Sequence, residues 1–347
     1  MKVIGATVLL IVTMVAAAWG QARKPATVAE LATYTGADRE KLLAEGAKRE
    51  GKLVWYTTLI AYKEIAKIFE AKYPGVRIEA YRSGSTDLVK RVLTEAQAKR
   101  YLVDAIETTP PGLMTFRDYK LLAPYTSPHL AAYPEASKEK AAGGLVYWVT
   151  DRESFVGVGY NKNSLKPNEV PKDFQDLLKP ELKGKFGASS DETGIRMIGA
   201  MLQSKGEEFV RKLKDQEIRL YPVSGGAMNE LVVSGEVPIS PTIFRNHVLT
   251  SIQKGAPVAW VPMDLVISNA GGAALSAQAR NPHAAVLFVD FLTSPEGQKI
   301  LEEKFKFGTP LKDYGFKRWL PEKGLTLSQY EEASEKWRKL LLEISKK

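Results

Sequence analysis

The stretch from Leu53 to Ser85 predicts a strand, a helix and a second strand in succession. Residues 53–56 form a short apolar run of β-favouring side chains, and residues 65–69 carry apolar side chains at helical spacing. Tyr73-Pro74-Gly75 ends that helix, and residues 76–81 then alternate between apolar and polar side chains. A strand, a helix and a strand in this order form a right-handed βαβ unit within a parallel sheet.

Polar side chains follow each predicted strand of this first half. Thr57 and Thr58 follow the first strand, and Arg82 begins a polar loop after the second. Because ligands of parallel sheets bind beyond the carboxyl ends of the strands, these loops predict a binding site for a small ligand. The serines of the second loop also suit plain capping of the next helix, and both interpretations stay open. The candidate residues of this half are Thr57, Thr58, Arg82, Ser83, Ser85 and Thr108, the last of which follows a third predicted strand.

The second half contains two similar loops. One is rich in hydroxyl groups and directly precedes a helix predicted from residue 195, and the other follows a strand predicted over residues 238–240. Arg82 and Arg245 each follow a predicted strand, one in each half, and a guanidinium can bind a carboxylate or phosphate with two parallel hydrogen bonds. An ordinary surface arginine paired with a nearby acid is the alternative for each. The candidate residues of this half are Ser189, Ser190, Thr193, Thr242 and Arg245.

Length and charge narrow the class of protein. A chain of 347 residues with 44% hydrophobic residues can bury two ordinary cores, so we expect two lobes. The net charge of +9 is spread among acidic residues, without a block of lysine and arginine or an alternation of basic and aromatic residues. We therefore expect no nucleic acid among the partners.

The first 22 residues predict a secretory signal peptide. Lys2 precedes an uncharged run that ends in small residues, and cleavage after Ala18 or Ala22 fits this pattern. An uncleaved membrane anchor is the alternative, although the apolar part is short for a membrane span. The chain has no cysteine, which excludes both a disulfide framework and a lipid-bearing cysteine. We expect a soluble protein of the periplasm.

The sequence carries no catalytic or metal-binding motif. His129, His247 and His283 lie far apart, without a partner at the spacing of metal ligands. The nucleophile elbow and the phosphate-binding loop are also missing from the chain. These observations predict a protein that is not an enzyme and that uses no cofactor and no resident metal.

Several segments resemble one known family. The strand and helix of the opening unit, the run DLLKPELKGKFGAS, the run GEVPIS and the run NPHAAVLFVDFLTSPEGQKIL occur in the order found in extracellular solute-binding proteins of ABC importers. The similarity is to the branch that binds ferric iron, phosphonates, thiamine and polyamines. The positions that match the last segment of the family are Pro282, Ala284, Ala285, Phe288, Phe291, Leu292, Ser294, Gly297 and Gln298.

This resemblance implies an α/β protein with the type II periplasmic-binding-protein fold. Two α/β lobes would enclose a central cleft and be joined by two crossover strands, expected near residues 156–161 and 259–263. The implied division is a signal peptide over 1–22, an N-terminal helical extension over 23–50, lobe 1 over 51–156 and 262–347, and lobe 2 over 157–261.

The resemblance also implies a function. A monomeric receptor would capture a small solute, either an organic anion or a phosphorus-containing compound, and deliver it to an ABC permease in the inner membrane. A ferric-iron carrier, a receptor that feeds a sensor protein and an enzyme built on the same fold are the alternatives.

One departure from the family argues against ferric iron. Iron-binding members resemble one another in a Tyr-Tyr pair within the loop that here reads Ser240 to Arg245, and this loop contains no tyrosine. Phenolate oxygens are hard donors that suit Fe(III). Tyr56, Tyr81 and Tyr160 lie near other strand ends and leave a different phenolate site open. An organic anion or oxoanion fits the loops better.

Overall fold

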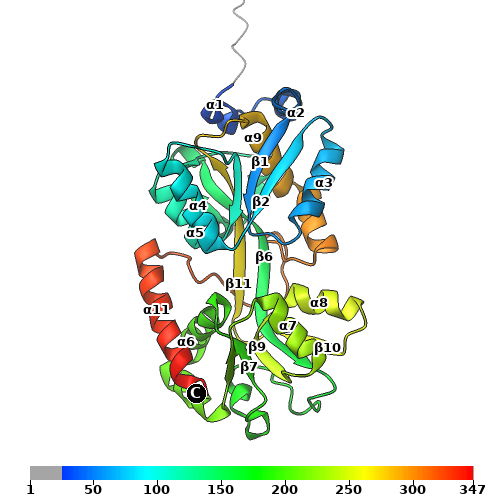
Figure 1. The fold of residues 1–347 in the computed structure, drawn as a ribbon, viewed down its shortest axis with the longest axis vertical. Coiled ribbons are helices and arrows are strands. Elements are labelled where there is room, and N and C mark those ends of the chain that lie inside the picture. Colours follow the sequence, from blue (N-terminus) through cyan, green and yellow to red (C-terminus); the bar gives the residue numbers. More distant parts are fainter. Residues whose placement is uncertain (1–25, 347) are drawn as a thin grey trace, which may run out of the picture.

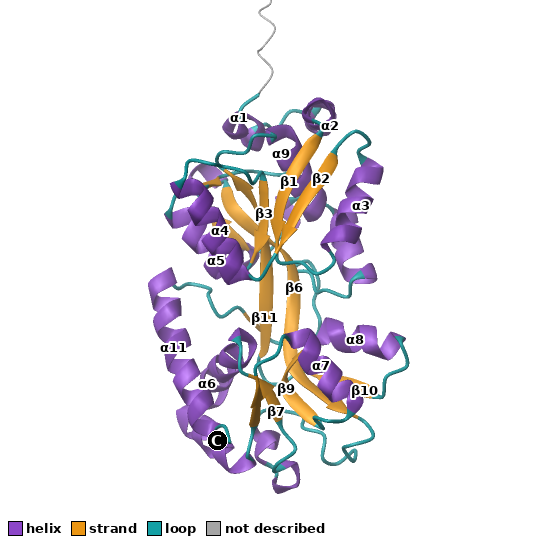
Figure 2. Ribbon diagram, in the orientation of Figure 1, coloured by secondary structure: helices purple, strands orange, loops and turns teal. Residues whose placement is uncertain are grey.

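The computed structural model describes residues 26–346 and shows two α/β lobes, one above the other in Figures 1 and 2. The predicted signal peptide lies outside these residues. The α-helices are α1 Val28–Thr33, α2 Arg39–Glu50, α3 Tyr62–Lys72, α4 Ser85–Gln97, α5 Pro110–Asp118, α6 Glu192–Lys212, α7 Gly225–Ser234, α8 Arg245–Gln253, α9 Pro282–Thr293, α10 Pro295–Lys299 and α11 Leu327–Ile344. The strands are β1 Lys52–Thr57, β2 Arg77–Arg82, β3 Ala105–Thr108, β4 Leu122–Ala123, β5 Lys138–Lys140, β6 Val146–Asn161, β7 Gly187–Ser189, β8 Arg219–Tyr221, β9 Ile239–Phe244, β10 Val258–Val261, β11 Val266–Ser276 and β12 Arg318–Trp319.

The predicted βαβ unit is confirmed. β1 pairs in parallel with β2 from Lys52 opposite Arg77 to Thr57 opposite Arg82, and α3 connects the two strands. Gly51 ends α2 at φ 75°, a left-handed conformation that glycine adopts without steric cost, and so turns the chain directly into β1. β3 pairs in parallel with the other edge of β1. The first lobe is therefore built around a parallel core of three strands.

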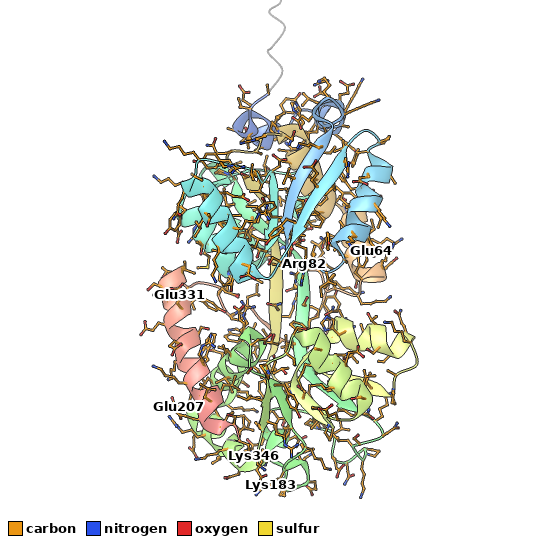
Figure 3. The ribbon with its side chains drawn as sticks, in the orientation of Figure 1. Glu64, Arg82, Lys183, Glu207, Glu331 and Lys346 are labelled. Carbon is orange, nitrogen blue, oxygen red and sulfur yellow. The ribbon has the colours of Figure 1, made fainter. Side chains whose placement is uncertain are left out.

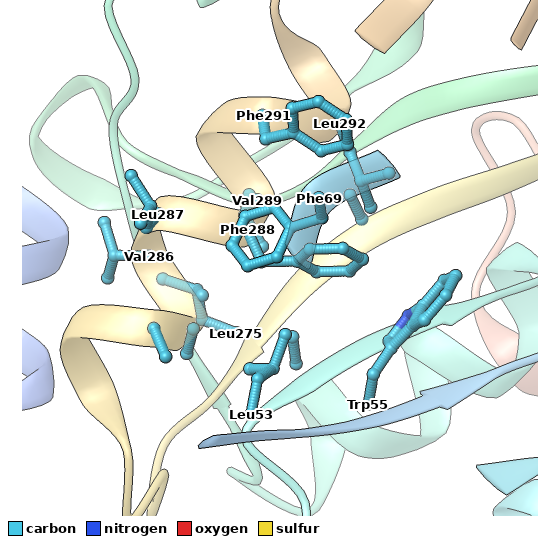
Figure 4. Close-up of a cluster of buried hydrophobic side chains, with 14 of the residues drawn as sticks. Leu53, Trp55, Phe69, Leu275, Val286, Leu287, Phe288, Val289, Phe291 and Leu292 are labelled. Carbon is cyan, nitrogen blue, oxygen red and sulfur yellow. The ribbon is translucent and has the colours of Figure 1, made fainter. Parts of the chain in front are cut away.

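Alternating side chains of β1 are buried on opposite faces of this sheet. Trp55 lies in the core beneath α2, α3 and α9, where its ring contacts Phe288 at a centroid distance of 4.8 Å. Figure 4 shows this cluster of aliphatic and aromatic side chains from β1, α3, β11 and α9. The next residue, Tyr56, belongs to a separate cluster beneath α4 and α5. The family-like segment that forms α9 thus supplies core side chains of the first lobe.

The second lobe has its own core. β7 and β8 pair in parallel, and β9 and β10 pair with the far end of β6. Figure 1 shows α6, α7 and α8 around these strands. The main cluster joins Phe174, Leu182 and Phe186 to the buried face of α6, and a smaller one lies under α7 and α8.

Two long strands cross between the lobes. β6 pairs with β11 from Trp148 to Val156 and then with β9 and β10 as far as Asn161. The predicted crossover at residues 156–161 is therefore only the end of a longer strand. The predicted second crossover at residues 259–263 is wrong, because most of it is β10, which pairs with β6 inside the second lobe. The second crossing strand is β11, which begins at Val266.

The C-terminal helix differs from the sequence-based division, which placed residues 262–347 in lobe 1. α11 packs against α6, and its buried residues belong to the core of the second lobe. Gly199 of α6 makes this approach close, because a Cβ there would lie 2.8 Å from both Trp319 and Trp337. An amphipathic helix joins whichever apolar face it can cover, and here that face belongs to α6. The other boundaries stay predictions.

None of the helices within residues 26–346 is long and apolar enough to cross a membrane.

Candidate ligand-binding site

Six strands have their carboxyl ends directed toward one short section of β6. They are β1, β2 and β3 of the first lobe and β7, β8 and β9 of the second. Gly272 of β11 pairs with both Thr108 at the end of β3 and Thr150 of β6. On the other lobe, β9 runs antiparallel to β6 and ends where Phe244 pairs with Val156. Thr150 and Val156, which mark these two levels on β6, are six residue steps apart, a distance of about 20 Å in extended chain. The two sets of strand ends therefore face each other across the crossover strands.

Arg82 is an exposed charged side chain at the strand ends of the first lobe. It ends β2, is exposed, and makes no hydrogen bond or ion pair with any residue in the described range 26–346. Figure 3 shows it at the end of the first lobe that faces the second. An unpaired guanidinium at this place is available to an anion.

The hydroxyl groups beside Arg82 form a small cluster. Ser85 Oγ lies 2.9 Å from Thr109 Oγ1 and accepts a hydrogen bond from Thr108 Oγ1 at 3.1 Å. Ser85 begins α4 and Thr109 precedes α5, so the cluster joins the N-termini of two helices. The backbone N–H of Ser83 donates to the carbonyl of Thr57 at 3.2 Å.

The hydroxyls of Thr57 and Thr58 form hydrogen bonds with charged side chains of the protein itself. Thr57 is fully buried, and its hydroxyl donates to Glu107 Oε2 at 2.6 Å. The hydroxyl of Thr58 donates to the same oxygen and accepts from Arg152 Nη2, both at 3.1 Å. The structure therefore places both hydroxyls in an internal network, and their contact with a ligand stays a prediction.

Three predicted hydroxyls of the second lobe are likewise bound to neighbouring backbone. Ser189 donates its hydroxyl to the Val223 carbonyl at 2.9 Å, and Ser190 donates to the Tyr221 carbonyl at 3.3 Å. Thr242 is buried and accepts from the backbone N–H of Ser189 at 3.0 Å. These bonds hold the ends of β7, β8 and β9 together. Thr193, half-buried in the first turn of α6, keeps its hydroxyl free of bonds within the described residues.

Arg245 stands at the first position of α8, immediately after β9. The sequence predicts a loop over residues 240–245, whereas the structure continues β9 through it and starts α8 at Arg245. The guanidinium carbon lies 5.4 Å from the ring centroid of Tyr314 and has no carboxylate partner among residues 26–346. Burial raises the pKa of Tyr314 to about 12, so that ring is neutral at physiological pH. Arg245 thus keeps its full charge available.

Five helices begin directly after the strands that end at this level. They are α4 after β2, α5 after β3, α6 after β7, α7 after β8 and α8 after β9. Helix N-termini present unpaired N–H groups and the positive end of the helix dipole. Their convergence makes the space between the lobes favourable for a negatively charged ligand.

The sequence reasoning missed a buried polar network on the crossover strands. Arg152 of β6 pairs with Glu107 of β3 at 3.0 Å and donates to the Asn269 carbonyl on β11 at 3.3 Å. The side-chain oxygen of Asn269 also accepts from Arg196 of α6. This chain of contacts connects the first lobe to the second. The one feature of the sequence that could have indicated this network is the charged triplet Asp151-Arg152-Glu153, which lies inside an otherwise largely apolar strand.

The donor set offers little to a metal ion. Among residues 26–346, no group of three or more histidine, cysteine, aspartate or glutamate side chains could hold one. Residues 240–245, where the family resemblance implies a Tyr-Tyr pair in iron-binding members, contain no tyrosine.

Comparison with known proteins agrees with this arrangement. The sequence profile of the bacterial extracellular solute-binding proteins matches residues 64–319, which is most of the chain. The chain belongs to this family. This solute-binding protein is 28% identical over 267 residues to an uncharacterized protein of Haemophilus influenzae, covering 73% of this chain and 76% of that one.

Two solved structures show which ligands similar proteins carry. Iron-bound HitA from Pseudomonas aeruginosa is 25% identical with a TM-score of 0.66, covering 84% of this solute-binding protein and 99% of HitA. AfuA from Actinobacillus pleuropneumoniae, with fructose-6-phosphate bound, is 24% identical with a TM-score of 0.64, covering 84% and 97%. The predicted type II periplasmic-binding-protein fold is confirmed by these similarities.

Proposed function

We propose that this protein is the substrate-binding component of an ABC importer and that its solute is a small organic anion. The observation that carries the proposal is the pair of unpaired arginines, Arg82 in the first lobe and Arg245 in the second, at strand ends that face each other. Their charges and the surrounding helix N-termini all favour a carboxylate or phosphate. The protein acts as a monomer without a cofactor and delivers the solute to a permease in the inner membrane.

Capture works by closure of the two lobes. β6 and β11 connect the lobes, and a small rotation about these strands would bring Arg245 toward Arg82. A solute that contacts both lobes binds the closed form better and shifts the population toward it. The protein performs no chemistry on the solute in this proposal.

Ferric iron is the second candidate because HitA, a similar protein, binds iron. The residues of this chain favour the anion, since residues 240–245, where the family resemblance implies a Tyr-Tyr pair in iron-binding members, contain no tyrosine. Phosphorylated compounds come first in a ligand screen, because AfuA has fructose-6-phosphate bound.

A thermal-shift screen of the purified protein tests the proposal. The compounds are carboxylates, phosphonates, sugar phosphates, polyamines, thiamine and Fe(III), and a ligand at 1,000 times its Kd adds about 4 kcal/mol of stability. We expect an organic anion to give the largest shift. Stabilisation by Fe(III) or a polyamine alone would contradict the proposal.

A pair of arginine variants then locates the site. Arg82→Ala should weaken anion binding at least tenfold, or about 1.4 kcal/mol, with little change in the melting temperature of the ligand-free protein. Arg77→Ala is the matched control, because Arg77 is an exposed arginine at the opposite end of the same strand. Equal affinity in the Arg82 and Arg77 variants would show that Arg82 does not contact the solute.

A further inference from the structure

A cavity lies in the first lobe, at the end away from the second lobe. Its volume is about 740 Å³, and it lies between the loop joining α1 to α2, the end of α3, residues 126–129, and the junction of α9 and α10. α3 ends where the chain returns to the start of β2, so this cavity is at the opposite end of the sheet from Arg82. The proposed anion site does not involve it.

The walls of this cavity are held rigidly by one buried arginine. Arg39 is 6% exposed and pairs with Asp290 of α9 at 2.7 Å. Its guanidinium also donates to the carbonyl of Leu31 in α1 and to that of Thr126, each at 3.1 Å, and to the carbonyl of Tyr34. One side chain therefore ties together three of the segments that surround the space. Cavities that exist before binding avoid the entropic cost of ordering their walls.

The lining carries one more negative than positive charge. Three carboxylates line it, of Glu40, Asp290 and Glu296, against the two cations Arg39 and Lys72. Asp290 pairs with Arg39 and Glu296 pairs with Lys72, which leaves Glu40 without a cationic partner among residues 26–346. Glu40 accepts a hydrogen bond from the Tyr73 hydroxyl at 3.0 Å, which leaves its second oxygen free to accept another.

The rest of the lining is largely aromatic and apolar. The rings of Tyr34, Tyr73 and Phe291 border the space together with Leu287. Burial lowers the pKa of His129, so its imidazole is neutral at physiological pH and adds no positive charge. Lys72 Nζ lies 5.7 Å from the ring centroid of Tyr73, so a cation is already placed against this ring in the protein.

We infer that this cavity is a second ligand site, for an organic cation with an aromatic or other apolar body. Tyrosine ring faces attract cations, Glu40 supplies the neutralising carboxylate, and the apolar lining accepts the body of the molecule. A volume of about 740 Å³ lies within the range of small-molecule sites. The site would bind a ligand opposite in charge to the solute proposed for the space between the lobes.

Calorimetric titration with matched probes tests the inference. Benzyltrimethylammonium is the cation, and benzyl alcohol and benzoate are the neutral and anionic compounds of similar shape. We expect the cation to bind at one equivalent and at least fivefold more tightly than either of the others. Equal binding of the three probes, or no binding of the cation at roughly 1 mM, would overturn the inference.

Three variants assign the binding to this cavity. Glu40→Gln should weaken binding of the cation about fivefold, whereas Glu45→Gln on the exposed side of the same helix should leave it unchanged. Thr35→Trp should abolish binding by filling the space, because Thr35 is an exposed residue of the lining. Unchanged affinity in both Glu40→Gln and Thr35→Trp would place the cation elsewhere and refute the site. A negative result here leaves the anion proposal untouched, since the anion screen does not depend on Glu40.

Discussion

The carboxylate of Glu107 and the guanidinium of Arg152 form a buried ion pair that passes over Gly271 of the strand between them. Glu107 is 0% exposed and Arg152 is 5% exposed, and their closest atoms lie 3.0 Å apart. β11 separates the two strands that carry them, so the pair spans the full width of this strand. Only glycine leaves room, because a Cβ at position 271 would lie 2.2 Å from Glu107 Oε1.

The first prediction follows from this close approach. Gly271→Ala should lower the free energy of unfolding by at least ~2 kcal/mol, because the new methyl group pushes apart a buried charge pair that cannot be solvated. Gly226→Ala in α7 is the control, since its Cβ would have no neighbour closer than 4.0 Å. Urea denaturation measures both. Equal midpoints for the two variants would show that the ion pair tolerates displacement.

The second prediction concerns Asp151, the extra residue of a β-bulge where β6 pairs with β11. Both of its carboxyl oxygens are buried and have no hydrogen-bond partner among residues 26–346. Burial, and to a lesser degree the nearby charge of Glu107, raises the pKa of Asp151 to about 8. In the unfolded chain the pKa is about 3.9. The folded protein thus holds this proton more tightly, and stability falls as the pH rises from about 4 to about 8.

The variant Asp151→Asn isolates this effect. It should match the wild type near pH 4 and exceed its unfolding free energy by ~2 kcal/mol or more above pH 8, because the amide never ionises. Asp215→Asn, at an exposed aspartate, should leave the slope of stability against pH unchanged. Denaturation curves across this pH range measure the difference. A constant gap between Asp151→Asn and the wild type would contradict the raised pKa.

The third prediction concerns the lobe that α11 stabilises. Trp337 is 8% exposed and packs edge-on against Trp319 at a centroid distance of 5.6 Å. Trp337→Ala should cost about 3–5 kcal/mol through the cavity it leaves. Arg338→Ala, at the exposed neighbouring position, should cost less than about 1 kcal/mol. In Trp337→Ala, backbone hydrogen exchange should accelerate in α6 and stay unchanged in β1. Acceleration in β1 alone would assign the helix to the first lobe.

Local order along the chain was predictable from the sequence. Residues 53–85 carry their own strand and helix periodicity, and Tyr73-Pro74-Gly75 supplies the stop signal, so no distant contact is needed to specify this unit. The segment that forms α9 could likewise be recognised from its match to the family. The extent of β6 was not predictable in this way, because the strand continues through the charged residues Asp151-Arg152-Glu153 only when partners on other strands surround them.

Only the tertiary structure decided which polar groups are free. Sequence spacing places Thr57, Thr242 and Arg82 alike at strand ends. The first two are buried with their hydroxyls engaged, whereas Arg82 is exposed and its side chain has no partner in the described part of the chain. Hydrogen-bond partners such as Glu107 come from segments about fifty residues away, and no local pattern encodes them. The same holds for α11, whose apolar stripe is visible in the sequence, whereas the face of α6 that it covers exists only in the folded protein.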